Sequence, residues 1–349
     1  MTENTASIWP APGTSGKLGR QDTLAYLARI NLEPEVADAK PSLELLTKIQ
    51  TAHLLAVPFE STSVHVRDWS DDDADIVLGQ GEIVPLEQRG FRHIVDLRRG
   101  GYCFLLNGTF PCLLRALGFT VSECLGRVNL IRKEPDIHGV DWSGLSHHIL
   151  IVDWPASDGD RYLCDVGFGS GPTSPMSIRH GTIVSSIPAT DEYQLQPHNY
   201  LPYVAPGILL DEAPTTWVLS RRAFSHDSTR ENPKRVWIPQ YAFSLVSTSH
   251  RDVRAMNHFQ STSSDSVFYN LFIATRLHAN GQRTTLVYHD GSVDDQGKRA
   301  AKLIQTQLIS AHENDRVLST RYVAMKVGPV RTTLEQEFGM CFPKDYAGN

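Results

Sequence analysis

Two β-prone runs in the middle of the chain constrain its fold more than any other feature. The first covers residues 147–153 and reads His-His-Ile-Leu-Ile-Val-Asp, and the second covers residues 161–166 and reads Arg-Tyr-Leu-Cys-Asp-Val. Because a short segment rich in Pro, Ser, Asp and Gly separates them, they are predicted to form a hairpin. Pairing would bring Asp165 level with the start of the first strand, where His147 and His148 lie. The residues alone leave open which histidine contacts Asp165.

Helical patterns precede this hairpin, and strand patterns dominate after it. Helices are expected at residues 22–31 with Asp22 as the cap, at residues 42–58 from Ser42 to the stop at Pro58, and at residues 104–117 with Gly118 at the end. Pro111 is expected to kink or shorten the third helix. Strands are expected at 216–219, 267–277 and 284–288, with a turn at Asn280-Gly281, and further helices at 295–302 and 333–338. Helices first and strands later indicate an α+β protein.

The composition fits a globular protein and excludes some classes of function. Of 349 residues, 41% are hydrophobic and 21% charged, and the net charge is −6. Since Lys and Arg are scattered, no nucleic-acid partner is expected. No run approaches the roughly 20 apolar residues of a membrane span, so no membrane partner is expected either. Residues 1–20 lack the basic and apolar segments of a signal peptide, and they are expected to form a flexible tail.

The five cysteines indicate reduced thiols, and hence a cytoplasmic location. They are Cys103, Cys112, Cys124, Cys164 and Cys341. An odd number without any CxxC pair argues against a disulfide framework and a thiolate zinc site. The histidines show no HExxH or similar ligand spacing, so no metal site is predicted.

Cys103 is the candidate nucleophile. Gly100 and Gly101 let the backbone bend just before it. The helical segment that follows places the thiol near a helix N-terminus, where unpaired N–H groups stabilise a thiolate. Composition alone favours a small buried hydrophobic residue, the usual fate of a free cysteine. The hairpin favours a nucleophile instead, because it offers a histidine as base and Asp165 as the group that orients that base.

Together, these residues resemble the arylamine N-acetyltransferase family. The three main motifs are Arg-Gly-Gly-Tyr-Cys at 99–103, Ser-His at 146–147 followed by Leu150 and Val152, and Asp-Val-Gly-Phe-Gly at 165–169, with upstream matches at 26–30 and 57–60. They occur in the family's order, and the likeness runs from about residue 22 to 178. Within this resemblance, Ser146 and Val152 select His147 over His148 as the catalytic histidine.

The resemblance implies a papain-like Cys-His-Asp triad on an α+β architecture of three parts. A helical domain is expected at residues 21–120, a β-barrel at 121–240, and an α/β lid at 241–349. An acyl-CoA would acylate Cys103, coenzyme A would leave, and an arylamine or arylhydrazine would attack the thioester. In this ping-pong route His147 would shuttle the proton, and Asp165 would hold the imidazole.

The same resemblance assigns further residues to the site. Ser143 and Gly144 match positions near the pantetheine of the acyl-CoA, and Phe168 matches an aromatic residue of the amine pocket. Ser266 falls in a stretch that resembles a coenzyme A-contacting segment. The residues expected to be structural are Arg99, which pairs with Glu60 beneath the nucleophile, and Asn107 on the nucleophile helix.

The sequence leaves open both the acyl donor and the class of reaction. Acetyl-CoA is the default donor, with propionyl- or malonyl-CoA as alternatives. Leu105 replaces a polar or acidic residue of many members, which could alter donor choice, and the length fits larger eukaryotic members such as fungal ones. The same triad could serve a cysteine hydrolase or an amide synthase, and the fold could carry a non-catalytic small-molecule binding protein.

Overall fold

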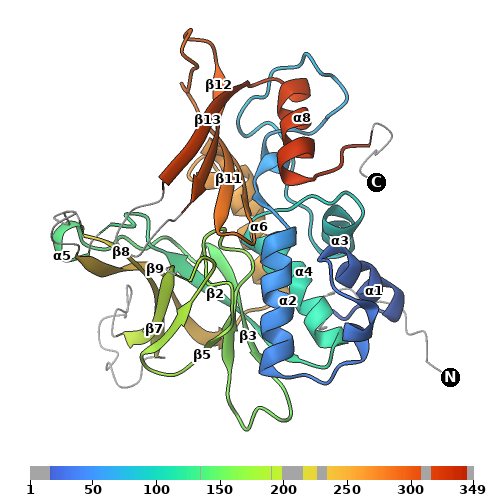
Figure 1. Cartoon of the computed structure of the whole chain (residues 1–349), viewed down its shortest axis with the longest axis vertical. Coiled ribbons are helices and arrows are strands. Elements are labelled where there is room, and N and C mark those ends of the chain that lie inside the picture. Colours follow the sequence, from blue (N-terminus) through green and yellow to red (C-terminus); the bar gives the residue numbers. More distant parts are fainter. Residues whose placement is uncertain are drawn as a thin grey trace.

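The structure, a computed structural model, describes residues 16–133, 135–189, 191–198, 215–225, 234–307 and 316–343. The expected N-terminal tail lies outside the described residues up to position 15. Figure 1 shows three parts: a group of helices from the first third of the chain, a curled sheet from the middle, and a second sheet with helix α8 above them.

The helical part contains four α-helices and two 3₁₀ turns. They are α1 (Arg20–Arg29), η1 (Pro34–Asp38), α2 (Leu43–Ala56), η2 (Thr62–Val64), α3 (Glu87–Val95) and α4 (Cys103–Ala116). Ser42 caps α2 as predicted, because its side chain accepts a hydrogen bond from the Leu45 N–H at 3.1 Å. The prediction that Asp22 caps α1 was wrong: Gly19 is the cap, and Asp22 lies in the first turn.

Helix α4 carries Cys103 as its first residue. Gly118 follows the C-cap in the left-handed conformation with a φ of +88°, as predicted for a glycine that ends a helix. Pro111 was expected to kink or shorten the helix, and it does not shorten it, since α4 continues to Ala116. Phe110, Cys112 and Leu113 are fully buried around the proline. Packing on both sides therefore outweighs the single backbone hydrogen bond that Pro111 cannot make.

The middle of the chain forms an eight-stranded antiparallel sheet. Its strands are β2 (Thr120–Val128), β3 (His147–Asp153), β4 (Tyr162–Cys164), β5 (Met176–Ser177), β6 (Thr182–Ser185), β7 (Glu192–His198), β8 (Thr216–Phe224) and β9 (Arg235–Ser247). The order is β5-β4-β3-β2-β9-β8-β7-β6, and the end strands β5 and β6 contact each other. The sheet is therefore barrel-like. The hairpin prediction is confirmed, because β3 pairs with β4 with Leu150 opposite Cys164.

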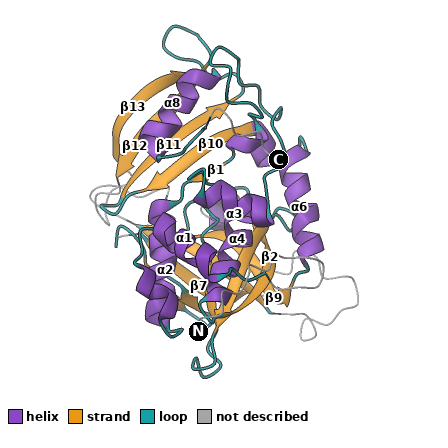
Figure 2. Ribbon diagram, turned by 90° about the vertical axis from the view of Figure 1, so that its right-hand side faces the viewer, coloured by secondary structure: helices purple, strands orange, loops and turns teal. Residues whose placement is uncertain are grey.

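The second sheet has the order β1-β10-β11-β12-β13 and is also antiparallel. Its strands are β1 (Phe59–Glu60), β10 (Leu271–Leu277), β11 (Gln282–His289), β12 (Ala300–Gln307) and β13 (Arg316–Ala324). The remaining helices are α5 (Pro135–His138), α6 (His250–Thr262), α7 (Val267–Asn270) and α8 (Val327–Phe338). In Figure 2 this sheet lies above the helical part, and β1 reaches up to it from the helices.

Two elements of this region differ from the sequence predictions. The strand expected from residue 267 begins only at Leu271, because Ser266 caps the short helix α7 by accepting a hydrogen bond from the Phe268 N–H at 3.1 Å. The helix expected at 295–302 is absent: those residues form a turn and the start of β12. Pairing with β11 places Leu303 opposite Leu286 in the core, so tertiary contacts decide the conformation.

Three hydrophobic cores correspond to the three parts. The first lies among α1–α4 and the outer face of β3 and β4, the second between the five-stranded sheet and α8, and the third inside the barrel-like sheet. Residue 120 is the first residue of β2, whereas residue 240 falls inside β9. The domain limits at these two positions stay predictions.

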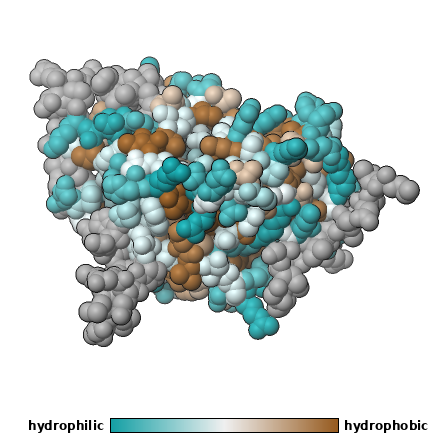
Figure 3. Space-filling model, turned by 90° about the horizontal axis from the view of Figure 1, so that it is seen from below, coloured by the Kyte–Doolittle hydropathy of each residue, from teal (hydrophilic) through white to brown (hydrophobic). Residues whose placement is uncertain are grey.

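The surface carries scattered hydrophobic side chains. Exposed examples come from distant elements, such as Leu43 in α2, Val246 in β9 and Val317 in β13. On the face in Figure 3, hydrophobic residues (brown) form narrow strips between hydrophilic ones (teal). None of the helices in the described ranges is long and apolar enough to cross a membrane.

Candidate active site

The loop before α4 places Cys103 against the start of β3. Gly100 is packed so tightly that a Cβ there would collide with the Pro58 carbonyl oxygen. The Glu60 N–H donates to the Gly101 carbonyl at 3.0 Å, which ties the loop to β1. Cys103 is buried, and its Sγ lies 3.8 Å from the Ser146 carbonyl oxygen. The thiol is thus held at a helix N-terminus, beside the residue that precedes His147.

The structure brings Asp165 to His147 and not to His148. The His147 Nε2 lies 2.8 Å from the Asp165 Oδ2, and both side chains are almost completely buried. Extended by one residue from the Leu150–Cys164 pair, the β3–β4 register places Asp165 opposite Ile149. Side chains alternate along a strand, so Asp165 lies on the same sheet face as His147. His148 points to the other face, where its ring stacks on Phe104 with centroids 6.0 Å apart. The alternation of side chains along β3 therefore separates the two histidines.

Asn107, one turn into α4, connects the nucleophile helix to both strands. Its Nδ2 donates to the His148 carbonyl at 2.6 Å and to the Asp165 Oδ1 at 2.8 Å, and its Oδ1 accepts from the Val166 N–H at 2.9 Å. The Gly167 N–H gives Asp165 Oδ1 a further hydrogen bond at 2.8 Å. With His147 on the other oxygen, this buried carboxylate is fully paired, as a buried charge must be.

The electrostatics of the site favour a charged imidazole. Burial by itself would lower the pKa of His147, but the Asp165 charge and hydrogen bonds with Asp165 and Cys103 raise it to about 9. Burial would raise the pKa of Asp165, but His147, Asn107 and the Gly167 N–H hold it below its ordinary value. A positively charged imidazole next to Cys103 stabilises a thiolate there.

Two aromatic rings confine His147. Phe168 meets the imidazole edge-on at a centroid distance of 5.0 Å, and Tyr241 of β9 lies 4.7 Å from it. Tyr241 is completely buried and also touches Phe168 at 4.9 Å. Tyr241 was not predicted from the sequence. The alternation Tyr241, Ala242, Phe243 marks an inward-facing strand position, but nothing local indicates which side chain it contacts.

Gly167 allows the chain after β4 to approach the nucleophile closely. A Cβ on Gly167 would lie 2.6 Å from the Cys103 Cα and 2.8 Å from the Asn107 Nδ2. Gly167 is therefore required by packing against the site. The next residue, Phe168, lies against the imidazole of His147.

A cavity of about 900 Å³ opens above these residues where the three parts meet. The sequence-predicted residues that line it are Cys103, Ser143, Gly144, His147, Phe168 and Ser266. The Ser143 Oγ accepts a hydrogen bond from the Val128 N–H at 2.8 Å, and the Ser266 Oγ donates to the Gln260 carbonyl at 2.8 Å. The second sheet and its helices close the far side with Phe268, Ile273 and other apolar residues.

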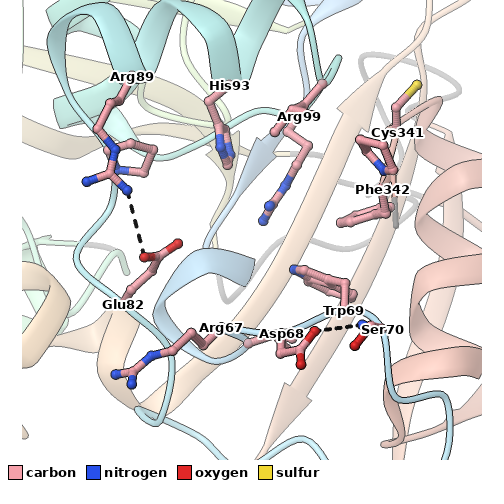
Figure 4. A pocket seen from close by; sticks show the side chains of 14 residues that line it. Arg67, Asp68, Trp69, Ser70, Glu82, Arg89, His93, Arg99, Cys341 and Phe342 are labelled. Carbon is pink, nitrogen blue, oxygen red and sulfur yellow. Dashed lines mark hydrogen bonds and ion pairs between the residues drawn. The ribbon is translucent and has the colours of Figure 1, made fainter. Parts of the chain in front are cut away.

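Arg99 and Glu60 lie outside this cavity, beneath the nucleophile loop. The Arg99 Nε is 4.0 Å from the Glu60 Oε1, a long ion pair, while the Arg99 Nη2 donates to the Thr62 Oγ1 at 2.7 Å. The guanidinium also lies 5.5 Å from the Trp69 ring and 5.0 Å from the Phe342 ring. Figure 4 shows Arg99 extending toward these two rings across a smaller cavity of about 110 Å³. Arg99 therefore connects the nucleophile loop to the C-terminal segment.

Within the part of the chain that the structure describes, no group of three His, Cys, Asp or Glu side chains could hold a metal ion. The groups available for chemistry are a thiol, an imidazole and a carboxylate. This set on an α+β fold is the arrangement of cysteine-dependent acyl-transfer enzymes, which pass an acyl group through a thioester.

The chain belongs to the N-acetyltransferase family, whose profile matches residues 42–330. It is thus an acyltransferase, and the family predicted from the motifs is confirmed. The arylamine N-acetyltransferase / N-hydroxyarylamine O-acetyltransferase of Salmonella typhimurium is 27% identical over 278 residues, which cover 78% of this chain and 81% of that protein. N-malonyltransferase FDB2 of Fusarium pseudograminearum is 27% identical over 254 residues, which cover 70% of this chain and 67% of that protein.

Solved structures agree with the fold. The Salmonella typhimurium arylamine N-acetyltransferase superimposes with a TM-score of 0.64 at 24% identity and covers 94% of each chain. The Mycobacterium marinum arylamine N-acetyltransferase in complex with CoA has a TM-score of 0.58 at 26% identity, over 90% of this chain and 92% of that one. The predicted α+β fold, with helices first, a β-barrel next and a C-terminal part of helices and strands, is confirmed.

Proposed function

We propose that this enzyme transfers an acyl group from an acyl-coenzyme A to an arylamine through a thioester on Cys103. The observation that carries the proposal is the chain of contacts from Cys103 through His147 to Asp165, at the wall of a 900 Å³ cavity. Relatives named arylamine N-acetyltransferases, and the similar Mycobacterium marinum structure in complex with CoA, support the choice of donor and acceptor. An arylhydrazine would serve in place of the amine.

The first half-reaction loads the enzyme. His147 holds the proton of the thiol, since its pKa of about 9 favours imidazolium, and Asp165 stabilises that charge. The Cys103 thiolate attacks the carbonyl carbon of the acyl-CoA, a new S–C bond forms, and the S–C bond to coenzyme A breaks. His147 gives its proton to the departing coenzyme A sulfur.

The second half-reaction transfers the acyl group from Cys103 to the amine. The amine nitrogen attacks the thioester carbon, and the neutral His147 accepts one of its protons. The Cys103–carbon bond then breaks, which regenerates the thiolate–imidazolium pair and releases the N-acylated amine. Phe168 lines the space next to His147 and would pack against the aromatic ring of the amine. Ser143, Gly144 and Ser266 would contact the pantetheine arm, because they line the same cavity.

Acetyl-CoA is the default donor, and the relative named as an N-malonyltransferase makes malonyl-CoA the leading alternative, with propionyl-CoA as a further one. The reaction is placed in the cytoplasm, where coenzyme A thioesters are available. The five free cysteines of the structure suit that reducing compartment.

The test is acylation of the protein in the absence of an amine. After incubation with acetyl-CoA, intact-mass analysis should show one acetyl group on the wild type and none on Cys103→Ala. Addition of an arylamine should remove the adduct and yield the acetylated amine. An adduct lost rapidly to water without amine would identify a hydrolase. Absence of an adduct with every acyl-CoA would support a binding protein.

A further inference from the structure

Arg132 is a cation beside the site that the mechanism above does not use. Its guanidinium carbon lies 4.9 Å from the centroid of the Phe168 ring. Phe168 in turn lies 5.0 Å from the His147 ring, so the guanidinium is within about 10 Å of the imidazole centre. Arg132 also lines the cavity that contains Cys103. One aromatic ring therefore separates this positive charge from the acyl-transfer centre.

The charge of the cavity wall is unbalanced. The described residues that line it include three arginines, Arg127, Arg132 and Arg283, and one carboxylate, Asp265. Arg127 donates to the Ser143 carbonyl at 3.1 Å, and Arg283 donates to the Gly169 carbonyl at 2.6 Å. Both hold backbone in place. A wall with more positive than negative charge favours an anionic ligand.

Arg132 differs from the other two arginines in its contacts. Its guanidinium contacts the Phe168 ring, and no carboxylate of the described residues pairs with it. Its side chain is exposed to solvent, yet neighbouring protein surrounds it enough that desolvation lowers its pKa. The contact with the Phe168 ring pairs the charge with no carboxylate, so the guanidinium N–H groups remain available for a bidentate contact with an anion.

We propose that Arg132 selects an acyl donor whose acyl group ends in a carboxylate, with malonyl-CoA as the shortest such donor. This inference rests on the proposed function. In a malonyl thioester one methylene separates the carboxylate from the reacting carbonyl, so the carboxylate lies roughly 4 Å from the Cys103 sulfur, given C–C bonds of about 1.5 Å. From its place over the Phe168 ring, the flexible Arg132 side chain would extend to that position and bind both carboxylate oxygens.

The chemistry of transfer is unchanged by the free carboxylate of the malonyl group. The Cys103–carbon bond forms as the bond to the coenzyme A sulfur breaks, and the proton passes from His147 to that sulfur. The malonyl carboxylate keeps its charge throughout, and no carbon–carbon bond breaks. Asp165 would repel the malonyl carboxylate from the other side of the His147 ring. Arg132 would offset this repulsion by neutralising the malonyl charge.

The experiment compares two donors in three proteins. kcat/KM is measured for malonyl-CoA and acetyl-CoA with one arylamine in the wild type, in Arg132→Met and in the control Lys133→Met. Lys133 is the adjacent exposed cation. The ratio of malonyl to acetyl values should fall at least tenfold in Arg132→Met, about 1.4 kcal/mol. It should stay within about twofold of the wild type in Lys133→Met. Arg132→Lys should recover part of the ratio, since it keeps the charge but loses the fork.

The other possible results would overturn either this inference alone or the proposed function as well. An equal fall for both donors in Arg132→Met would show that Arg132 binds the coenzyme A portion or merely supports Phe168. An acetyl adduct on wild-type Cys103 without a malonyl adduct would overturn this inference and leave the proposed function intact. No adduct with either donor would overturn both. Arg132→Gln and thermal melting of every variant exclude misfolding as the cause.

Discussion

At the scale of single residues, Cys103 differs from the other buried thiols in the groups around it. Burial raises the pKa of Cys112 to about 12 and that of Cys124 to about 11, and it raises the pKa of Cys164 well above its ordinary value. These three thiols stay protonated and unreactive near neutral pH. Cys103 instead contacts an imidazole that favours the charged form, so the surroundings select one nucleophile.

The two adjacent histidines should differ sharply when mutated. His147→Gln removes the group that holds the Cys103 proton, and acyl transfer should fall by at least about a hundredfold. His148→Gln should cost far less activity, because His148 faces Phe104 on the other side of β3. It lies 3.2 Å from Glu123, so its main effect should be a lower melting temperature. Steady-state rates and thermal melts of both variants are the measurement, and a reversed order of severity would contradict the assignment.

Asp165→Asn should change how Cys103 reactivity depends on pH. Burial lowers the pKa of His147, but Asp165 and, after it, Cys103 raise it to about 9, above the unfolded value of about 6.5. A raised pKa favours the imidazolium, and that stabilisation is complete below about 6.5 and lost as the pH rises through about 9. The Asn variant loses the charge that supports the imidazolium at neutral pH, so the proton returns to sulfur.

Alkylation of Cys103 by iodoacetamide between pH 5 and pH 10 measures this change. The variant should react slowly near pH 7 and recover toward high pH, as a free thiol with a pKa of about 8.5 does. Labelling is followed on Cys341→Ser proteins, because Cys341 is exposed and would add its own signal. An unchanged profile in a folded variant would show that Asp165 does not act through His147.

At the scale of elements, the sequence predicts what local signals determine. The β3–β4 hairpin follows from β-branched residues around a turn, and α2 follows from the Ser42 cap. At 267–270 a local signal was missed, the Ser266 cap of α7. At 295–302 a tertiary contact decides, the pairing of β12 with β11. A run of residues that suits either helix or strand does not indicate which segment of the chain it will pair with.

The same limit applies to the site. Cys103, His147, Asp165 and the lining residues were found because their motifs are contiguous in sequence. Tyr241, Arg132 and Arg283 were not, since their positions depend on closure of the barrel-like sheet and on the approach of the second sheet. The choice between His147 and His148 required the resemblance, because the alternation of β3 becomes informative only once the pairing register is known.

The segment after β4 should tolerate no side chain at Gly167. In Gly167→Ala the new methyl group would lie 2.6 Å from the Cys103 Cα and displace α4 or the segment itself. Overpacking of this kind costs about 1–3 kcal/mol, and acyl transfer should fall at least tenfold. Gly171→Ala is the matched control, because its methyl group would make an ordinary 3.6 Å contact with the Phe168 Cβ. Denaturant unfolding and initial rates test both, and equal behaviour of the two variants would contradict the packing argument.

At the scale of the whole molecule, the cavity is built by parts that are separate in sequence. The nucleophile comes from α4, the histidine and aspartate from the barrel-like sheet, and much of the far wall from α6, α7, β10 and β11. β1 belongs to the helical part in sequence, yet its Phe59 pairs with Thr275 of β10. The substrates would therefore contact all three parts at once, and contacts between the parts control the shape of the cavity.

Arg283 is the contact through which the second sheet fixes the Phe168 segment. It extends from β11 and donates to the Gly169 carbonyl at 2.6 Å, directly after Phe168. In Arg283→Met that segment loses its anchor, so KM for the arylamine should rise about three- to tenfold, the effect of losing a charge-assisted hydrogen bond. The His147–Asp165 contact lies within the barrel-like sheet and does not use Arg283. Alkylation of Cys103 by iodoacetamide should therefore proceed at close to the wild-type rate.

Arg321→Met is the matched control for this variant. Arg321 lies on β13 of the same sheet, but it pairs with Glu337 at 2.8 Å on the exposed surface, away from the cavity. Its removal should leave both the KM and the alkylation rate unchanged, because exposed ion pairs contribute little. Equal slowing of alkylation and acyl transfer in Arg283→Met would mean that the second sheet also shapes the nucleophile. A rise in KM with unchanged alkylation would show that this sheet controls amine binding while the other two parts hold the reacting groups.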